Sequence, residues 1–199
     1  MSAADEILDI VDENDHVIGQ APRGEAYAKG LIHRSVHVFV REPRGRVFVH
    51  RRTAVKLAFP SMYDMFVGGV VAAGEGYDEA ALREAEEELG VSGLDRPVPL
   101  FSFLYESAED GGFRSWSRVY EVVCALPVRP QVEEVAWHAF VPEEELERRL
   151  AAGPGGWEWV PDGAEAYERL KALRATGAAD GTGAAGASDA TDGTGVADA

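Results

Sequence analysis

Three glutamates on one predicted helix are the side chains of this sequence best suited to chemistry. Glu84, Glu87 and Glu88 stand at positions i, i+3 and i+4 of residues 77–89, a segment whose apolar residues recur with helical spacing. At about 100° per residue, the three carboxylates fall on one side of the helix. Clustered carboxylate oxygens are ligands that Mg²⁺ accepts, and its other positions are left for water and substrate phosphates. The spacing therefore indicates a divalent-cation site that could serve phosphate chemistry.

A solvated acidic face is the alternative interpretation of the same three residues. Like charges one turn apart destabilise a helix by a few tenths of a kcal/mol per pair, and no lysine separates them here. The flanking residues favour a site. Gly68 and Gly69 end a predicted strand, where a backbone carbonyl could approach a cation because no side chain obstructs it, and Arg83 directly precedes the first glutamate.

The stretch from Gly69 to Val91 resembles the Nudix box, G-x5-E-x7-R-E-U-x-E-E-x-G-U, where U is a bulky aliphatic residue. Eight positions match at the required spacing: Gly69, Glu75, Arg83, Glu84, Glu87, Glu88, Gly90 and Val91. Ala85 departs from the pattern, because a larger aliphatic residue is usual there. Segments outside the box, between about residues 6 and 173, look like the branch that includes isopentenyl-diphosphate isomerase and its hydrolase-like relatives.

The resemblance implies an enzyme, a Nudix pyrophosphohydrolase that uses Mg²⁺, or Mn²⁺, to cleave a phosphoanhydride bond. The substrate class would be a nucleoside diphosphate linked to another group, or a related organic pyrophosphate. The implied metal ligands are Glu84, Glu87 and Glu88, and we add the Gly68 carbonyl to them. Glu75 is expected to pair with Arg83 and hold the loop against the helix.

The remaining site residues are less closely tied to the box. The general base comes either from the box helix, as Glu84, or from a later loop, as Glu133 or Glu134. Arg51 follows a strand at which relatives often present a cation to a substrate phosphate, and Gly69 is expected to lie against the substrate.

Two other functions are compatible with the same scaffold. The isomerases use a Cys and a Glu for proton transfer, but Gly68 and Arg118 stand at the corresponding positions here, and Cys124 lies in an apolar run typical of a buried thiol. His33 matches one isomerase metal ligand, but Val70 replaces its partner, so we interpret His33 as structural or substrate-facing. A non-catalytic module that senses a nucleotide is the third hypothesis.

The predicted elements are short strands around one central helix, followed by two terminal helices. Helical patterns cover residues 77–89, 142–151 and 161–173, and strand patterns cover 8–11, 17–20, 35–40, 47–51, 65–71, 100–106, 117–126 and 134–141. A doubly wound parallel sheet would need a helix after nearly every strand. The order instead predicts an α/β fold, a Nudix-type α/β/α sandwich with a mixed central sheet.

Composition and charge limit the partners of the chain. It has 199 residues, 46% of them apolar, and a formal net charge of −16, which repels nucleic-acid backbones and anionic membranes. The single cysteine, the acidic first twenty residues and the lack of a long apolar run predict a cytoplasmic protein. We expect one domain over residues 5–174 and a disordered Ala/Gly/Thr/Asp-rich tail over 175–199. The expected partner is a small diphosphate, with no general nucleic-acid or membrane binding, and a homodimer is left open.

Overall fold

The computed structural model describes residues 2–107, 112–153 and 156–180. The chain divides into two units, Met1–Ala166 and Tyr167–Ala199. The sheet and every residue of the candidate site belong to the first unit. Among the described residues, no helix is long and apolar enough to cross a membrane.

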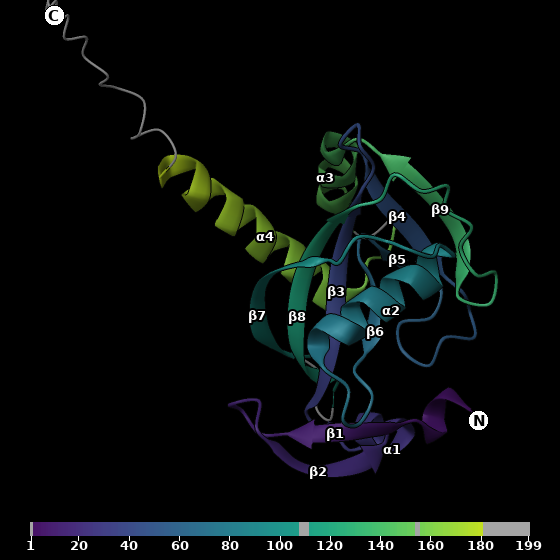
Figure 1. The fold of residues 1–199 in the computed structure, drawn as a ribbon, viewed down its shortest axis with the longest axis vertical. Coiled ribbons are helices and arrows are strands. Elements are labelled where there is room, and N and C mark those ends of the chain that lie inside the picture. The colour runs from purple at the N-terminus through teal and green to yellow at the C-terminus, as the bar shows by residue number, and fades with distance from the viewer. Residues whose placement is uncertain (1, 108–111, 154–155, 181–199) are drawn as a thin grey trace, which may run out of the picture. The chain divides into compact units, whose positions relative to one another are not determined.

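Nine strands of the described residues join one mixed sheet (Figure 1). They are β1 (Ile7–Val11), β2 (Val17–Pro22), β3 (His33–Arg41), β4 (Val47–Arg52), β5 (Tyr63–Asp64), β6 (Val67–Val70), β7 (Val98–Glu106), β8 (Arg114–Val123) and β9 (Val135–Val141). Strand β3 is central, because it pairs in parallel with β8 and antiparallel with β6. This register places Gly68 opposite His37 and Gly69 opposite Val36. The mixed sheet confirms the predicted fold class.

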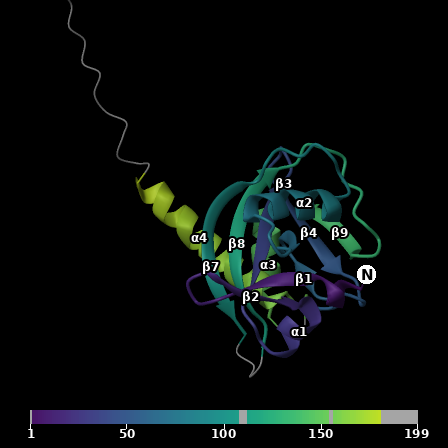
Figure 2. The same ribbon diagram turned by 60° about the horizontal axis from the view of Figure 1, so that its bottom comes forward.

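The helices are η1 (Ala3–Asp5), α1 (Arg23–Ala28), α2 (Tyr77–Leu89), α3 (Glu143–Ala151) and α4 (Pro161–Asp180). Helix α2 has the predicted bounds. Figures 1 and 2 together show α2 and α3 on opposite sides of the sheet, as a sandwich requires. The short helix α1, which follows the β1–β2 hairpin, has no counterpart among the predicted elements. Its six residues are too few to show a helical period.

Helix α2 packs on the sheet through small side chains. Ala80, Ala81, Ala85 and Leu89 are fully buried and join a cluster with the β3 valines, Val36, Val38 and Val40. Three alanines let the helix axis approach the strands closely. The departure from the box pattern at Ala85 is therefore accommodated in the core, because a larger side chain would have to displace its neighbours.

Several predicted boundaries differ from the structure. The strand expected over residues 65–71 is shorter, β6 at Val67–Val70, and a separate strand, β5, precedes it at Tyr63–Asp64; between them the Phe66 N–H donates to the Asp64 carboxylate at 3.0 Å. Helix α4 continues to Asp180, so residues 175–180 of the expected tail are helical, which agrees with the high helix propensity of alanine. Residues 181–199 of that segment lie outside the described residues.

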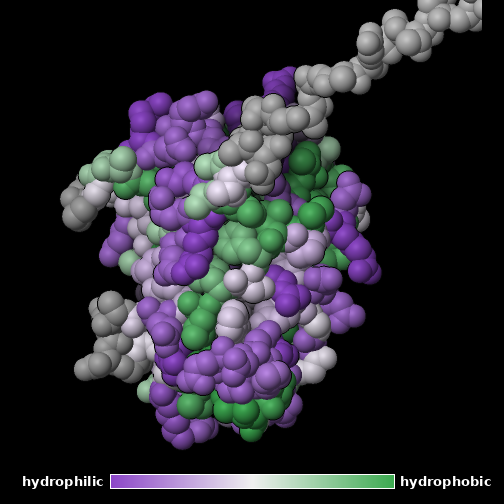
Figure 3. Space-filling view, turned by 90° about the vertical axis from the view of Figure 1, so that its left-hand side faces the viewer, coloured by the Kyte–Doolittle hydropathy of each residue, from purple (hydrophilic) through white to green (hydrophobic). Residues whose placement is uncertain are grey.

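The N-terminal hairpin carries exposed apolar side chains. Ile7, Val17 and Ile18 of strands β1 and β2 are exposed. In Figure 3, hydrophilic areas flank an apolar band across the middle of the face shown, and a second apolar area lies at the bottom of the view, the end at which the hairpin lies in Figure 1.

Candidate active site

Helix α2 presents its glutamates next to the core-facing alanines. Its first residue follows Gly76, whose N–H donates to the Glu79 carboxylate at 3.3 Å, and it ends at Gly90 in a left-handed conformation. A Cβ at Gly90 would lie 1.8 Å from the Arg129 carbonyl oxygen, so only glycine fits this helix end. Asp78, in the first turn, accepts a hydrogen bond from the Tyr120 hydroxyl at 2.6 Å.

Strand β6 approaches these glutamates so closely that side chains are excluded from its glycines. A Cβ at Gly69 would lie 2.5 Å from Glu84 Oε2, and one at Gly68 would lie 2.0 Å from the Val36 carbonyl oxygen. The Gly68 N–H donates to Glu88 Oε2 at 3.2 Å. The glycine pair therefore brings backbone directly against the carboxylates, as its sequence suggests.

Arg83 connects the loop before α2 to the glutamates. Its Nε and Nη2 donate to the two Glu75 carboxylate oxygens, each at 2.8 Å. Its Nη1 lies 2.7 Å from Glu84 Oε1 and 3.4 Å from Glu87 Oε2. One guanidinium thus fixes three carboxylates in relation to each other, including the expected Glu75 partner.

Glu84 is the most strongly perturbed of these carboxyl groups. Burial raises its pKa to about 7, the Arg83 charge opposes that rise, and the negative charges of Glu88 and Glu87 add to it. A carboxyl group that titrates near neutrality can either hold a cation or exchange a proton, depending on what it faces.

Glu84, Glu87 and Arg83 face a cavity of about 260 Å³ that extends away from α2. Aromatic side chains line another part of it, and a third part is buried and polar. The lining side chains used below are Tyr27, His37, Arg52, Lys56, Phe59, Asp64, Phe66, Phe113, Glu134 and Asp162. Glutamates at the wall of a cavity are placed where they can meet a substrate.

Lys56 joins the helix to the later loop across this cavity. Its ammonium lies 3.3 Å from Glu88 Oε1 and 2.9 Å from Glu134 Oε2. Of the two late-loop candidates for the base, Glu134 lines the cavity, whereas the described contact of Glu133 is its carbonyl oxygen, which accepts from the Thr53 hydroxyl at 2.8 Å. Lys56 was not singled out from the sequence, because nothing in the pattern of its loop brings it to residues 32 and 78 positions away.

Comparison with known proteins agrees with this geometry. Residues 31–163 match the NUDIX domain. An uncharacterized Nudix hydrolase of Streptomyces coelicolor is 69% identical over 175 residues, which cover 87% of this chain and 93% of that protein. The chain belongs to the Nudix hydrolase family.

The chain is also similar to a second group of relatives and to solved structures. The uncharacterized Nudix hydrolase YfcD of Escherichia coli strain K12 is 37% identical, with coverage of 82% of this chain and 86% of that protein. A crystal structure of a Deinococcus radiodurans protein aligns with a TM-score of 0.68 at 35% identity, covering 82% of this chain and 98% of that one. A MutT protein from Methanosarcina mazei has the same fold at 20% identity, with a TM-score of 0.57 and coverage of 72% and 95%.

Nudix hydrolases generally use divalent metal ions, and the donors of this one suit a hard cation. In the described residues, no group of three or more His, Cys, Asp and Glu side chains is already arranged around a common point. Arg83 and Lys56 instead pair with the three glutamates. Because Gly69 has no Cβ, its backbone lies close to the Glu84 carboxylate. Backbone and carboxylate oxygens are thus near one another, and these residues fit a cation.

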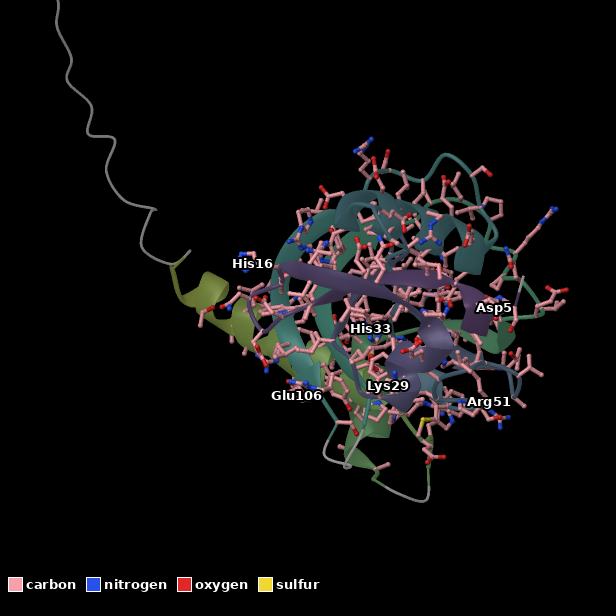
Figure 4. All side chains as sticks on the ribbon, turned by 90° about the horizontal axis from the view of Figure 1, so that it is seen from below. Asp5, His16, Lys29, His33, Arg51 and Glu106 are labelled. Atoms are coloured by element: carbon pink, nitrogen blue, oxygen red, sulfur yellow. The ribbon has the colours of Figure 1, made fainter. Side chains whose placement is uncertain are left out.

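Arg51 does not line the cavity of this Nudix hydrolase, as far as the described residues show. Its Nε donates to the Ser61 carbonyl at 2.9 Å, and its side chain is exposed at the periphery in Figure 4. Arg52 lines the cavity instead, and the β4–β9 register shifts between the two arginines. The cavity-lining arginine at this strand end is therefore Arg52 and not the predicted Arg51.

The residues that bear on isomerase chemistry lie elsewhere. Arg118 Nε donates to Ser102 Oγ at 3.1 Å and its guanidinium stacks on Tyr77, whereas Cys124 is buried with its Sγ 3.7 Å from the Leu126 carbonyl. No cysteine is among the described residues that line the cavity. The proton-transfer pair of an isomerase is therefore not assembled in this part of the chain.

His33 is held in aromatic packing rather than at the cavity wall. It is 1% exposed, its ring centroid lies 4.9 Å from that of Phe113 and 5.2 Å from that of Tyr27, and its Nδ1 lies 3.2 Å from the Leu31 carbonyl oxygen. Figure 4 shows it near the middle of the molecule. Burial lowers its pKa to about 4, which supports the structural interpretation.

Proposed function

We propose that this Nudix hydrolase uses Mg²⁺ to cleave the phosphoanhydride bond of a nucleoside diphosphate linked to another group, or of a related organic pyrophosphate. The observation that carries the proposal is the contact of Glu84 with the Gly68–Gly69 strand end at the wall of a cavity. Glu84, Glu87, Glu88 and the Gly68 carbonyl would hold the cation. When bound, such a cation neutralises phosphate oxygens and stabilises the charge that develops on them.

The side chains of the protein would position the reactants. Arg83 holds Glu84 and Glu87 in a fixed relation to the loop at Glu75. Lys56 and Arg52 add positive charge to the cavity that receives the diphosphate. The anhydride would thus be bound beside α2.

The proton of the attacking water needs a carboxylate as its acceptor. As the oxygen of water bonds to phosphorus and the anhydride P–O bond breaks, either Glu84 or Glu134 would take the proton, because both line the cavity. Single substitutions distinguish them. The pH dependence of kcat keeps its acidic limb when the residue replaced by glutamine is not the base, and loses it when that residue is the base.

The proposal is tested with a panel of nucleotide and non-nucleotide diphosphates, in Mg²⁺ or Mn²⁺, by measuring the phosphate-containing products. We expect turnover that chelation abolishes, and a Glu87→Gln variant whose kcat is at least about a hundredfold lower with little loss of stability, because this side chain is half exposed. Glu86→Gln is the matched control, because Glu86 lies on the same helix but outside the cavity lining. Its carboxylate accepts hydrogen bonds from the N–H groups of Gly93 and Leu94.

Two outcomes would contradict the proposal. Unchanged turnover in Glu87→Gln would remove the assignment of the site. Nucleotide binding at millimolar Mg²⁺ with no hydrolysis of any diphosphate would favour the non-catalytic sensing module.

A further inference from the structure

Three buried polar side chains of the same cavity have no part in the phosphate chemistry above. His37 comes from β3, Asp64 from β5 and Asp162 from the first turn of α4, and all three line the cavity that Glu84 faces. They are between 4% and 7% exposed. Burying polar groups costs free energy unless they find partners, so their contacts indicate what the cavity is built to receive.

The two aspartates are partly satisfied by backbone. Asp64 Oδ1 accepts the Phe66 N–H at 3.0 Å, and Asp162 Oδ1 accepts the Gly163 N–H at 3.0 Å. A Cβ at Gly163 would lie 2.6 Å from Asp64 Oδ1, so the start of α4 is in contact with the Asp64 carboxyl. These bonds fix the orientation of both carboxyl groups and leave one oxygen of each, Oδ2, with no backbone hydrogen bond described.

His37, the third side chain of the cluster, has a ring nitrogen without a hydrogen-bond partner among the described residues. Its Nε2 is buried and makes no hydrogen bond within the described residues, and it lies 3.7 Å from Asp162 Oδ2, beyond a good bond length. Its ring meets Phe66 edge to face with centroids 5.7 Å apart, which holds the imidazole in place. An orphaned ring nitrogen at a cavity wall is explained when a ligand completes its hydrogen bond.

The charges around this cluster make one carboxyl group a donor. Burial raises the pKa of Asp64 to about 8, with the negative charges of Asp162 and Glu88 adding to the rise and Arg52 and the Phe66 N–H opposing it. Near neutral pH, Asp64 therefore carries a proton that it can donate, and Asp162 Oδ2, which faces His37, is an oxygen that can accept. Burial also lowers the pKa of His37.

Aromatic side chains line the same cavity. Tyr27, Phe59 and Phe113 are among its lining residues, and the Phe113 ring lies 5.2 Å from Tyr27 and 5.4 Å from Phe59, centroid to centroid. A flat ring system buries its faces well against such side chains. The cavity thus combines carboxylates at α2, an aromatic part and the buried polar cluster.

We propose that His37, Asp64 and Asp162 bind the hydrogen-bonding edge of an amino-substituted heterocycle, such as the amino group and adjacent ring nitrogen of cytosine or adenine. Asp162 accepts from the amino group and Asp64 donates to the ring nitrogen, while His37 supplies a further hydrogen bond. The inference rests on the proposed function, because it names the group attached to the diphosphate. Oxo-substituted bases present the opposite donor and acceptor order at this edge and are disfavoured.

Equilibrium binding tests the proposal without requiring hydrolysis. Calorimetry on the full chain in chelator compares two pairs of monophosphates that differ only at this edge, CMP with UMP and AMP with IMP. We expect the amino member of each pair to bind at least about tenfold more tightly. Equal affinities within both pairs, or no binding of any, would overturn the proposal.

Substitutions at Asp64 then separate recognition from general damage. Asp64→Asn keeps a donor and an acceptor and is expected to retain the preference, whereas Asp64→Leu loses it, with Glu144→Gln as an exposed control that removes one negative charge. Circular dichroism checks that each variant is folded. A preference that survives in Asp64→Leu would contradict the assignment.

The two proposals fail in different ways. A higher affinity for CMP than for UMP, with no hydrolysis of any diphosphate, would contradict the enzymatic proposal and support the recognition site. Hydrolysis of CDP and UDP derivatives with equal kcat/KM, together with equal monophosphate affinities, would leave the enzyme and remove the recognition site.

Discussion

Arg83 and Glu75 form an ion pair with two parallel hydrogen bonds of 2.8 Å, and the Ala72 N–H donates to the same carboxylate at 3.0 Å. This pair joins the loop before α2 to the helix, and the remaining Arg83 nitrogen, Nη1, reaches Glu84 and Glu87. A planar guanidinium can make this set of contacts at once, whereas an ammonium cannot. Arg83 is therefore a positioning residue for the glutamates.

Replacement of Arg83 by lysine tests that role, because it keeps the charge and removes the fork. We expect kcat to fall at least about tenfold and the affinity for Mn²⁺ to fall with it, because Glu84 and Glu87 lose their common partner. Steady-state kinetics and metal titration measure the two effects. Arg96→Lys, an exposed arginine outside the cavity lining, serves as the control. Wild-type kcat and Mn²⁺ affinity in Arg83→Lys would show that the glutamates are positioned without it.

Gly69→Ala places a methyl group where the Glu84 carboxylate now lies, 2.5 Å from Oε2. The carboxylate must move, so we expect kcat to fall at least about tenfold, as for loss of a well-placed electrostatic group. Gly19→Ala is the control, because a Cβ there meets nothing within 4 Å. The measurement is kcat together with the melting temperature of both variants. An unchanged kcat in Gly69→Ala would mean that the position of Glu84 does not matter for the reaction.

The local pattern of the sequence was sufficient for helix α2 and the glycine pair. The spacing of Ala81, Ala85 and Leu89 gives a helix of the observed length, and Gly90 marks its end. The fold class followed from the order of strands and helices, and the structure confirms it. These features depend on residues that are close in the sequence, which is why a single chain reveals them.

The opposite wall of the cavity depends on contacts between distant segments. Asp64 and Asp162 are 98 positions apart, and nothing in the period of either segment shows that they share a cavity. The contacts of Lys56 with Glu88 and Glu134 likewise arise from the folding of distant segments, and local spacing does not show them. The sequence predicts that a helix begins at Pro161. It does not show that this helix start, with Asp162 and Gly163, lies against Asp64 of β5.

Lys56 is the ammonium that now faces the buried Glu88 carboxylate, and its removal tests how the site treats a cation. In Lys56→Met we expect tighter Mn²⁺ binding, by about tenfold, because the metal no longer displaces an ammonium from a carboxylate that is 1% exposed. The metal-free variant should be less stable than the wild type and should gain more stability from Mn²⁺. Calorimetry and thermal unfolding with and without Mn²⁺ measure this, with Lys29→Met as the exposed control. Weaker Mn²⁺ binding in Lys56→Met would show that the lysine supports the cation site.

The protonated state of Asp64 predicts a pH dependence of stability. Its folded pKa of about 8 lies above the value of 3.8 for an exposed carboxyl group, so the folded state holds a proton that the unfolded state has released. The stabilising contribution is complete below about pH 4 and is lost as the pH rises toward 8. Asp64→Asn removes this dependence because its amide does not titrate.

Chemical unfolding of wild type and Asp64→Asn between pH 5 and 8 measures the effect. The free energy of unfolding of the wild type should fall relative to that of the variant by about 1 kcal/mol per pH unit over the lower part of this range. Asp95→Asn, at an exposed position, should show no such difference. A constant difference between wild type and Asp64→Asn across these pH values would show that Asp64 is ionised in the fold, and it would then present two acceptors and no donor to a bound heterocycle.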